Sequence, residues 1–208
     1  MSLKGADGGI PAEGIGAAVR MVGPQTGRLT TVAGTDSVGP LGDGGPAASA
    51  FVQTCQGSNI RGGGEVAVDH AGDLVIADEG GDRIRVVARR SGTVYGQPVT
   101  AGDIYTVAGT GTGGFSGDRG PATTAKLKNP QGVAVDHAGN LLIADTGNNR
   151  IRVVAAATGT FYGQPMTAGD IYTPTGTGAG GFSGDRGPAA GAELNSPATV
   201  TVDHSYTW

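Results

Sequence analysis

Short apolar runs separated by turn residues are the main pattern of this 208-residue chain. Segment 130–154 shows the pattern most fully, with apolar runs of strand length at 133–136, 141–144 and 151–154. These runs alternate little between apolar and polar residues, which is typical of strands covered on both faces. The spacers between them are rich in Asp, Gly and Asn, which favour tight turns. The pattern therefore predicts hairpins of antiparallel strands inside a stack of sheets.

The same pattern recurs with a fixed period. An Asp-His pair follows the first strand of each unit at 69–70, 136–137 and 203–204, at intervals of 67 residues. Constant spacing over two intervals predicts a repeat architecture. After its third strand each unit has an arm around Gly-Gln-Pro, which predicts an elongated hairpin leading into a fourth strand. We therefore expect an all-β fold with two complete units, at 65–110 and 132–177.

Both ends of this array of units are incomplete. Residues 17–35 resemble only the third and fourth strands of a unit, and residues 199–204 resemble only the first strand. Residues 1–16 contain five glycines and little periodicity, so we expect a loose lead-in there. A fixed connector, Gly-Asp-x-Gly-Pro-Ala, starts at residues 42, 117 and 184 and joins successive units.

Composition limits the classes of protein that fit. The 41 glycines and 11 prolines approach the range typical of disorder, but their strict repetition assigns them to turns. The net charge of −4 argues against nucleic acid or anionic membranes as partners. Cys55 is the only cysteine, so no intrachain disulfide is expected. No apolar run approaches the roughly 20 residues of a membrane span or forms a signal core, so we expect a soluble chain without a signal peptide, cytoplasmic or exported within a longer protein.

The repeated polar motifs favour structural roles over chemistry. The Asp-His pairs could supply metal ligands, but equivalent positions one unit apart should lie far from one another, and Asp commonly starts turns. Asp78 faces Arg83, and Asp145 faces Arg150, across four-residue loops, which predicts ion pairs that stiffen the two hairpins. The Gly-rich segment 113–121 lacks the Lys-Ser or Lys-Thr of a phosphate loop and has too few carboxylates for calcium. We therefore predict no catalytic, cofactor-binding or metal-binding residues.

A unit of strand, turn, strand, Ala-Asp-x-Gly-Asn-x-Arg-Ile-Arg and strand is similar to the NHL repeat. Residues 133–154 match this pattern closely, residues 66–87 nearly as well, and residues 18–35 and 199–204 in part. The connector resembles the long blade linker of bacterial members of that family. The resemblance implies a partial β-propeller with two complete four-stranded blades and a partial blade at each end. A ring usually needs about 4 to 8 blades, so one chain is not expected to close it.

The resemblance implies a non-catalytic recognition or scaffold module that binds a protein or another ligand. The alternative is a fragment of a propeller enzyme similar to gluconolactonase-type hydrolases or amidating lyases, which hold metal ligands from several blades at the central channel. The positions at the channel rim, where the inner strands start, hold Glu65, Gln131 and Thr199. We predict these three residues as a candidate binding set. Recognition is favoured over catalysis because the set contains a single carboxylate.

Incomplete blades leave apolar faces and unpaired strand edges that favour association. Phe115 and Phe182, in the linkers, are expected to fill the gaps between adjacent blades. Two copies placed head to tail would set residues 199–204 of one copy beside residues 18–35 of the other. We therefore expect a homodimer that completes the propeller, an open monomeric fragment, or a truncated product of a longer propeller.

Overall fold

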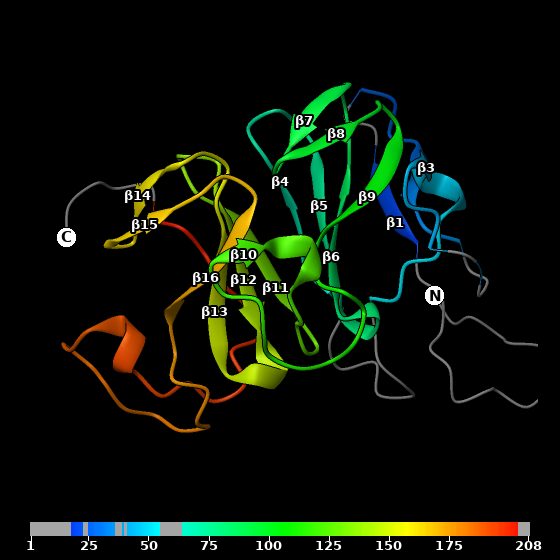
Figure 1. Ribbon diagram of the computed structural model, residues 1–208. Helices are drawn as coiled ribbons and strands as arrows, with labels where there is room; N and C mark the ends of the chain where they lie inside the picture. Colours follow the sequence, from blue (N-terminus) through cyan, green and yellow to red (C-terminus); the bar gives the residue numbers. More distant parts are fainter. Residues whose placement is uncertain (1–17, 23–24, 36–38, 40, 55–63, 204–208) are drawn as a thin grey trace, which may run out of the picture.

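The computed structural model describes residues 18–22, 25–35, 39, 41–54 and 64–203. Within these residues the regular structure is β-strand apart from short 3-10 turns, and no α-helix is present. Two five-stranded antiparallel sheets form the body of the fold and stand beside one another (Figure 1). The predicted all-β fold is confirmed. The predicted lead-in at 1–16 lies outside the described residues.

Each complete sheet is one predicted blade with an additional strand. Blade 1 contains, from the inside outward, β4 (Val66–Val68), β5 (Leu74–Asp78), β6 (Arg83–Val87), β9 (Asp103–Ala108) and the two-residue β3 (Gly45–Pro46). Blade 2 contains β11 (Gly132–Val135), β12 (Leu141–Asp145), β13 (Arg150–Val154), β16 (Asp170–Thr175) and β10 (Gly120–Pro121). The fifth strand comes from the linker that precedes each blade, so a linker also completes the sheet that follows it.

The arms and the partial blade form separate two-stranded sheets. The arms are the hairpins β7 (Gly92–Val94) with β8 (Gln97–Val99), and β14 (Gly159–Phe161) with β15 (Gln164–Met166). β1 (Val19–Val22) pairs with β2 (Leu29–Ala33) and forms the third and fourth strands of a half-blade, at the opposite end of the molecule from β14 and β15 (Figure 1). Residues 199–203, predicted to start a further blade, belong to no strand because no second strand of that unit lies beside them in the described part of the chain.

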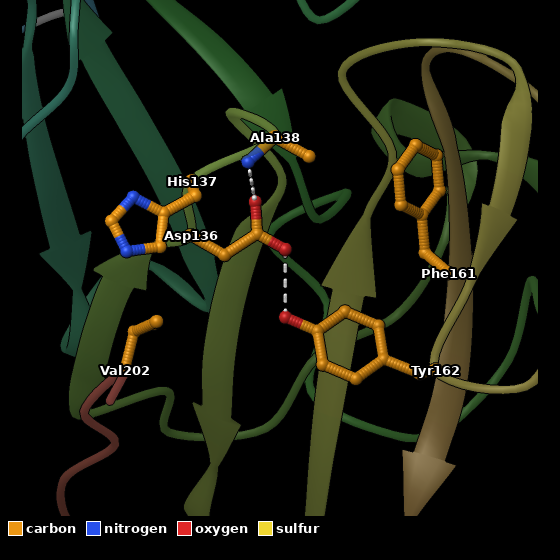
Figure 2. A pocket seen from close by; sticks show the side chains of 6 residues that line it. All are labelled: Asp136, His137, Ala138, Phe161, Tyr162 and Val202. Carbon is orange, nitrogen blue, oxygen red and sulfur yellow. Dashed lines mark hydrogen bonds between the residues drawn. The ribbon is translucent and has the colours of Figure 1, made fainter. Parts of the chain in front are cut away.

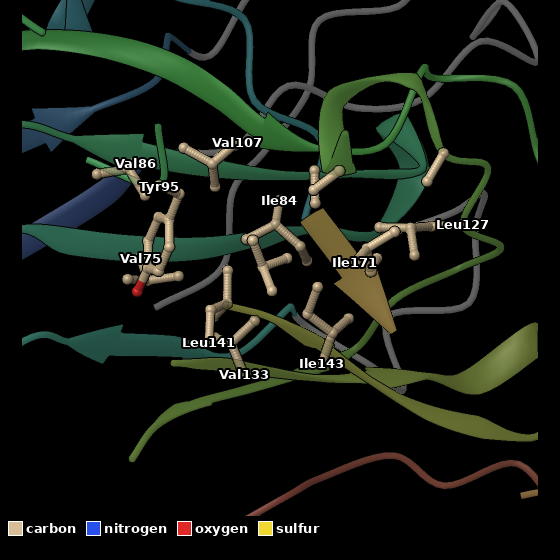
Figure 3. Close-up of a cluster of buried hydrophobic side chains, with 14 of the residues drawn as sticks. Val75, Ile84, Val86, Tyr95, Val107, Leu127, Val133, Leu141, Ile143 and Ile171 are labelled. Atoms are coloured by element: carbon tan, nitrogen blue, oxygen red, sulfur yellow. The ribbon is translucent and has the colours of Figure 1, made fainter. Parts of the chain in front are cut away.

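One packing mode joins neighbouring sheets. Between the two blades, Ile84 and Val86 of blade 1 pack in one buried cluster with Leu141 and Ile143 of blade 2 (Figure 3). Burying a side chain of this size stabilises a fold by about 1.5–3 kcal/mol. The half-blade packs on blade 1 through the equivalent residues of the repeat, namely Val19, Ala33, Leu74, Ile76, Val87 and Ile104. The same interface is therefore built twice.

The far face of blade 2 carries the equivalent apolar positions without a stacked sheet in the described residues. Tyr95 is 8% exposed between the blades, whereas its equivalent Tyr162 is 47% exposed. Ile84 is likewise buried, whereas its equivalent Ile151 is partly exposed. We call this surface the open face of blade 2. It comprises Ile151 and Tyr162, which stay at least partly exposed, and Leu142 and Val153, which are buried in a cluster that Val200 and Val202 help to cover.

Candidate functional site

The three predicted rim residues lie together at the inner edge of the sheets. The backbone N–H of Glu65 donates to the carbonyl of Gln131 at 2.7 Å, so β4 and β11 start side by side. The Glu65 carboxylate oxygen Oε2 accepts the backbone N–H of Val133 at 3.2 Å and the hydroxyl of Thr199 at 3.4 Å. One carboxylate therefore links the starts of three successive units.

A fourth rim residue, Glu79, was not found from the sequence. It lies in the 3-10 turn Glu79–Gly81 between β5 and β6, where its Oε1 accepts a hydrogen bond from the side-chain amide of Gln131 at 2.9 Å. Glu79 is only 7% exposed, and its Oε2 has no hydrogen-bond partner. The equivalent residue of blade 2 is Thr146, so a departure from the repeat was the signal that could have revealed it. We call Glu65, Glu79, Gln131 and Thr199 the channel mouth.

The hairpin necks have a different ion pairing from the predicted one. Asp78 stands directly opposite Arg83 in the sheet register, but its carboxylate pairs with Arg85 at 3.5 Å. Arg83 instead donates to the carbonyls of Gly81 and Thr110. Arg83 lies beside the loop and reaches these carbonyls, while Arg85 is a diagonal neighbour on the same face of the sheet. Blade 2 repeats this correction: Asp145 pairs with Arg152, not with Arg150, which donates to the carbonyls of Asn148 and Thr177.

Two fully buried arginines join the linkers to the blades. Arg152 donates to Asp118 of the linker at 2.8 Å and to Asp145 at 3.3 Å. Burial raises the pKa of Asp145, and hydrogen bonds from Asn148 and from the backbone of Lys128 oppose that rise. In blade 1, Arg85 binds Asp43 at 2.7 Å in the same way. Asp43 and Asp118, the aspartates of the first two linkers, are thus engaged by arginine.

Phe115 packs against the same region of blade 2. Its ring lies 3.8 Å from the Arg150 guanidinium and 4.8 Å from that of Arg152, which are cation–π distances. This aromatic contact adds to the ion pairs in holding the linker on the blade that follows it.

The Asp-His pairs start turns, but they lie closer together than the sequence suggested. Oδ1 of Asp136 accepts the backbone N–H groups of Ala138 and Asn140 at 2.9 and 2.8 Å, the arrangement of an Asx turn. The rings of His70 and His137 stack with their centroids 6.4 Å apart, so equivalent turns of adjacent blades are neighbours. Within the described ranges, no group of three or more His, Cys, Asp or Glu side chains could hold a metal ion. His204 lies outside those ranges.

A shallow pocket of about 280 Å³ lies on the open face of blade 2. Figure 2 shows the Tyr162 hydroxyl donating to Asp136 Oδ2, a bond of 2.8 Å, with Phe161 and Val202 also lining the space. Burial, together with this bond to a carboxylate, raises the pKa of Tyr162. Because the equivalent Tyr95 is buried between the two blades, the pocket occupies a place that sheet packing fills elsewhere in the molecule.

Comparison with known proteins identifies the repeat. The NHL repeat family matches residues 127–154, which contain the first three strands of blade 2. Residues 127–154 therefore form an NHL repeat. Human Teneurin-1 is 33% identical to this NHL-repeat chain over 108 residues, which are 47% of the chain and 4% of Teneurin-1. Human Teneurin-4 is 37% identical over 99 residues, 43% of the chain and 3% of Teneurin-4. The NHL-repeat chain therefore spans only a few per cent of the length of these relatives.

Solved structures agree with a partial propeller. A protein of unknown function from Bacteroides thetaiotaomicron superimposes with a TM-score of 0.56 and 14% identity, covering 84% of the NHL-repeat chain and 34% of that protein. An auxiliary nutrient binding protein from the same species gives a TM-score of 0.54 and 15% identity, covering 92% and 39%. At such identities the likeness establishes the fold alone. None of the helices in the described residues has the length and apolar character to cross a membrane.

Proposed function

We propose that this NHL-repeat chain is a non-catalytic recognition and scaffold module that holds its partner at the channel mouth. The observation that carries the proposal is the Glu79 carboxylate, which is buried and has one oxygen without a donor. A buried acceptor without a hydrogen bond is costly, so a donor supplied by a partner would stabilise the complex. The partly exposed Glu65 lies beside it across Gln131.

The chemistry of the mouth favours a cationic group. Among the described residues, neither Glu65 nor Glu79 forms an ion pair with a Lys, Arg or His side chain of the chain itself. Ammonium and guanidinium groups donate several hydrogen bonds to carboxylates, and such bonds are stronger than neutral ones. A lysine or arginine side chain of a protein partner therefore fits this site. No specific feature of the described residues favours the alternative of a propeller hydrolase or lyase.

Fluorescence anisotropy with labelled peptides of equal length tests the proposal. The set comprises a lysine-rich, an arginine-rich, a neutral and a glutamate-rich peptide. We expect the basic peptides to bind, and Glu65→Gln to weaken their binding by about 10- to 150-fold, because a hydrogen bond to a charged group contributes about 1.5–3 kcal/mol. Asp103→Asn removes the same charge from an outer strand and is the matched control.

Two results would reject the proposal. Equal effects of Glu65→Gln and Asp103→Asn would mean that net charge, not the channel mouth, governs binding. Saturable hydrolysis of a lactone or a phosphoester that Glu65→Gln abolishes would instead favour the enzyme alternative. The same purified protein serves for both assays.

A further inference from the structure

Each complete blade is fastened by a clamp with three parts. In blade 1 the linker residue Asp43 accepts the buried guanidinium of Arg85 at 2.7 Å, and the Thr106 hydroxyl donates to the same carboxylate at 2.8 Å. Blade 2 repeats the clamp with Asp118, Arg152 and Thr173. The clamp therefore joins an aspartate of the linker to an arginine of the third strand and a threonine of the fourth strand.

The linker that follows blade 2 carries half of another clamp. Its backbone has the form of the preceding linker: the N–H of Gly176 donates to Ala189, as the N–H of Gly109 donates to Ala122. Its aspartate, Asp185, is exposed and makes no ion pair with any described residue. Phe182, the equivalent of Phe115, is 90% exposed. In the sequence, this half-clamp directly follows β16, the last strand of blade 2.

The half-blade at the other end carries the missing half. Arg20 is paired with Thr31 across β1 and β2, as Arg85 is paired with Thr106 in blade 1. Arg20 is exposed and, like Asp185, forms no ion pair within the described residues.

The outer surface of the half-blade is also apolar. Val22 and Leu29 are 62% and 57% exposed. Their equivalents in blade 2, Val154 and Ile171, are buried between the blades. The half-blade therefore exposes the apolar positions that face a preceding sheet elsewhere in the molecule.

We propose that a second copy of this chain docks its half-blade on the open face of blade 2, with Arg20 of one copy bound to Asp185 and stacked on Phe182 of the other. The contact reproduces the sheet-on-sheet step that the molecule already contains twice. It buries Val22 and Leu29 of one copy against Ile151 and its neighbours on the other. Such a head-to-tail interface closes when its rotation completes a ring. Each copy supplies three unit positions, so two copies reach the range of about 4 to 8 blades of closed propellers.

Sedimentation velocity over a concentration series tests this interface. We expect a single dimer of twice the 20.4 kDa chain mass. Arg20→Asp and Asp185→Arg should each weaken dimerisation by more than about tenfold, as expected for a close charge pair at an interface. The variant that carries both changes should regain the dimer, because the charges are exchanged. Both positions are exposed, so circular dichroism should show the wild-type fold in all variants.

Arg186→Asp is the matched control, since the equivalent Arg119 stays exposed beside the formed clamp of blade 2. It should leave the dimer intact, while Phe182→Ala should weaken it. A monomer at every concentration would overturn the proposal. A sheet from a different protein would then be the occupant of the open face. A dimer that survives both charge reversals, or species that grow beyond the dimer, would also overturn it.

Discussion

Replacing Arg152 with methionine tests whether the buried linker network stabilises the blade. Methionine fills much of the same space but leaves the fully buried Asp145 without its cationic partner. Removing one member of a buried ion pair costs about 3–5 kcal/mol. Asp145 keeps its hydrogen bonds from the Lys128 backbone and the Asn148 side chain, so we expect the lower end, about 3 kcal/mol. That is a large part of the 5–15 kcal/mol by which most domains are stable.

Urea unfolding followed by circular dichroism measures this loss directly, and calorimetry should show a melting temperature lower by about 6–12 °C. Arg119→Met, at an exposed linker position, is the control and should change the free energy of unfolding by less than about 0.5 kcal/mol. If Arg152→Met lowers the free energy of unfolding by less than about 1 kcal/mol, the buried network does not stabilise the blade. The attraction within the ion pair would then only offset the desolvation of its two charges. Arg85→Met in blade 1 repeats the experiment, because its guanidinium binds Asp43 and Asp78 in the same way.

Two further predictions concern titration and backbone shape. Burial raises the pKa of Asp145, so from about pH 4 up to that raised value the folded chain binds more protons than the unfolded chain, and the stability contributed by this group is lost as pH rises. Asp145→Asn should remove this part of the pH dependence of the unfolding free energy above about pH 4, and identical slopes in both proteins would contradict the assignment. Gly109 and Gly102 have similar positive φ angles of 93° and 87°, but a Cβ at Gly109 would collide with the Asp82 carbonyl while one at Gly102 meets nothing. Gly109→Ala should therefore lower the urea midpoint clearly more than Gly102→Ala, and equal midpoints would show that φ strain alone matters.

Local patterning was sufficient to predict the strands of the blades. The apolar run at 141–144 and the Asn-rich spacer after it predicted β12, its turn and β13. This worked because the residues that determine the turn and the lengths of the strands are adjacent in the sequence. Asn149 occupies the left-handed region that this turn requires, with φ of 54°. The repeat period then transferred the same assignment to blade 1.

Features that depend on tertiary approach were not predictable in this way. Gly120 and Pro121 form β10 only because β16 offers its edge, and nothing in this two-residue segment is typical of a strand. The carboxylate of Asp78 pairs with the diagonal Arg85 and not with Arg83, which stands directly opposite. This pairing depends on how the fold packs around the buried guanidinium of Arg85.

At the candidate site, Glu65, Gln131 and Thr199 were named from the sequence, and the structure places them together, while their role in binding stays a prediction. Their position at the start of each inner strand followed from the repeat. Glu79 was missed because its importance comes from a contact with Gln131, a residue 52 positions away.

The linker strand β10 has a consequence for how such a chain is put together. β10 precedes blade 2 in the sequence yet pairs with β16, the last strand of that blade. The two ends of the unit therefore meet, with Gly120 opposite Ile171, and part of the outer edge is closed by the unit itself. Whole units can then be added or removed without opening this hydrogen-bonded edge in those that remain. Duplication and recombination would act on such a chain at the linkers, where one self-closed unit gives way to the next.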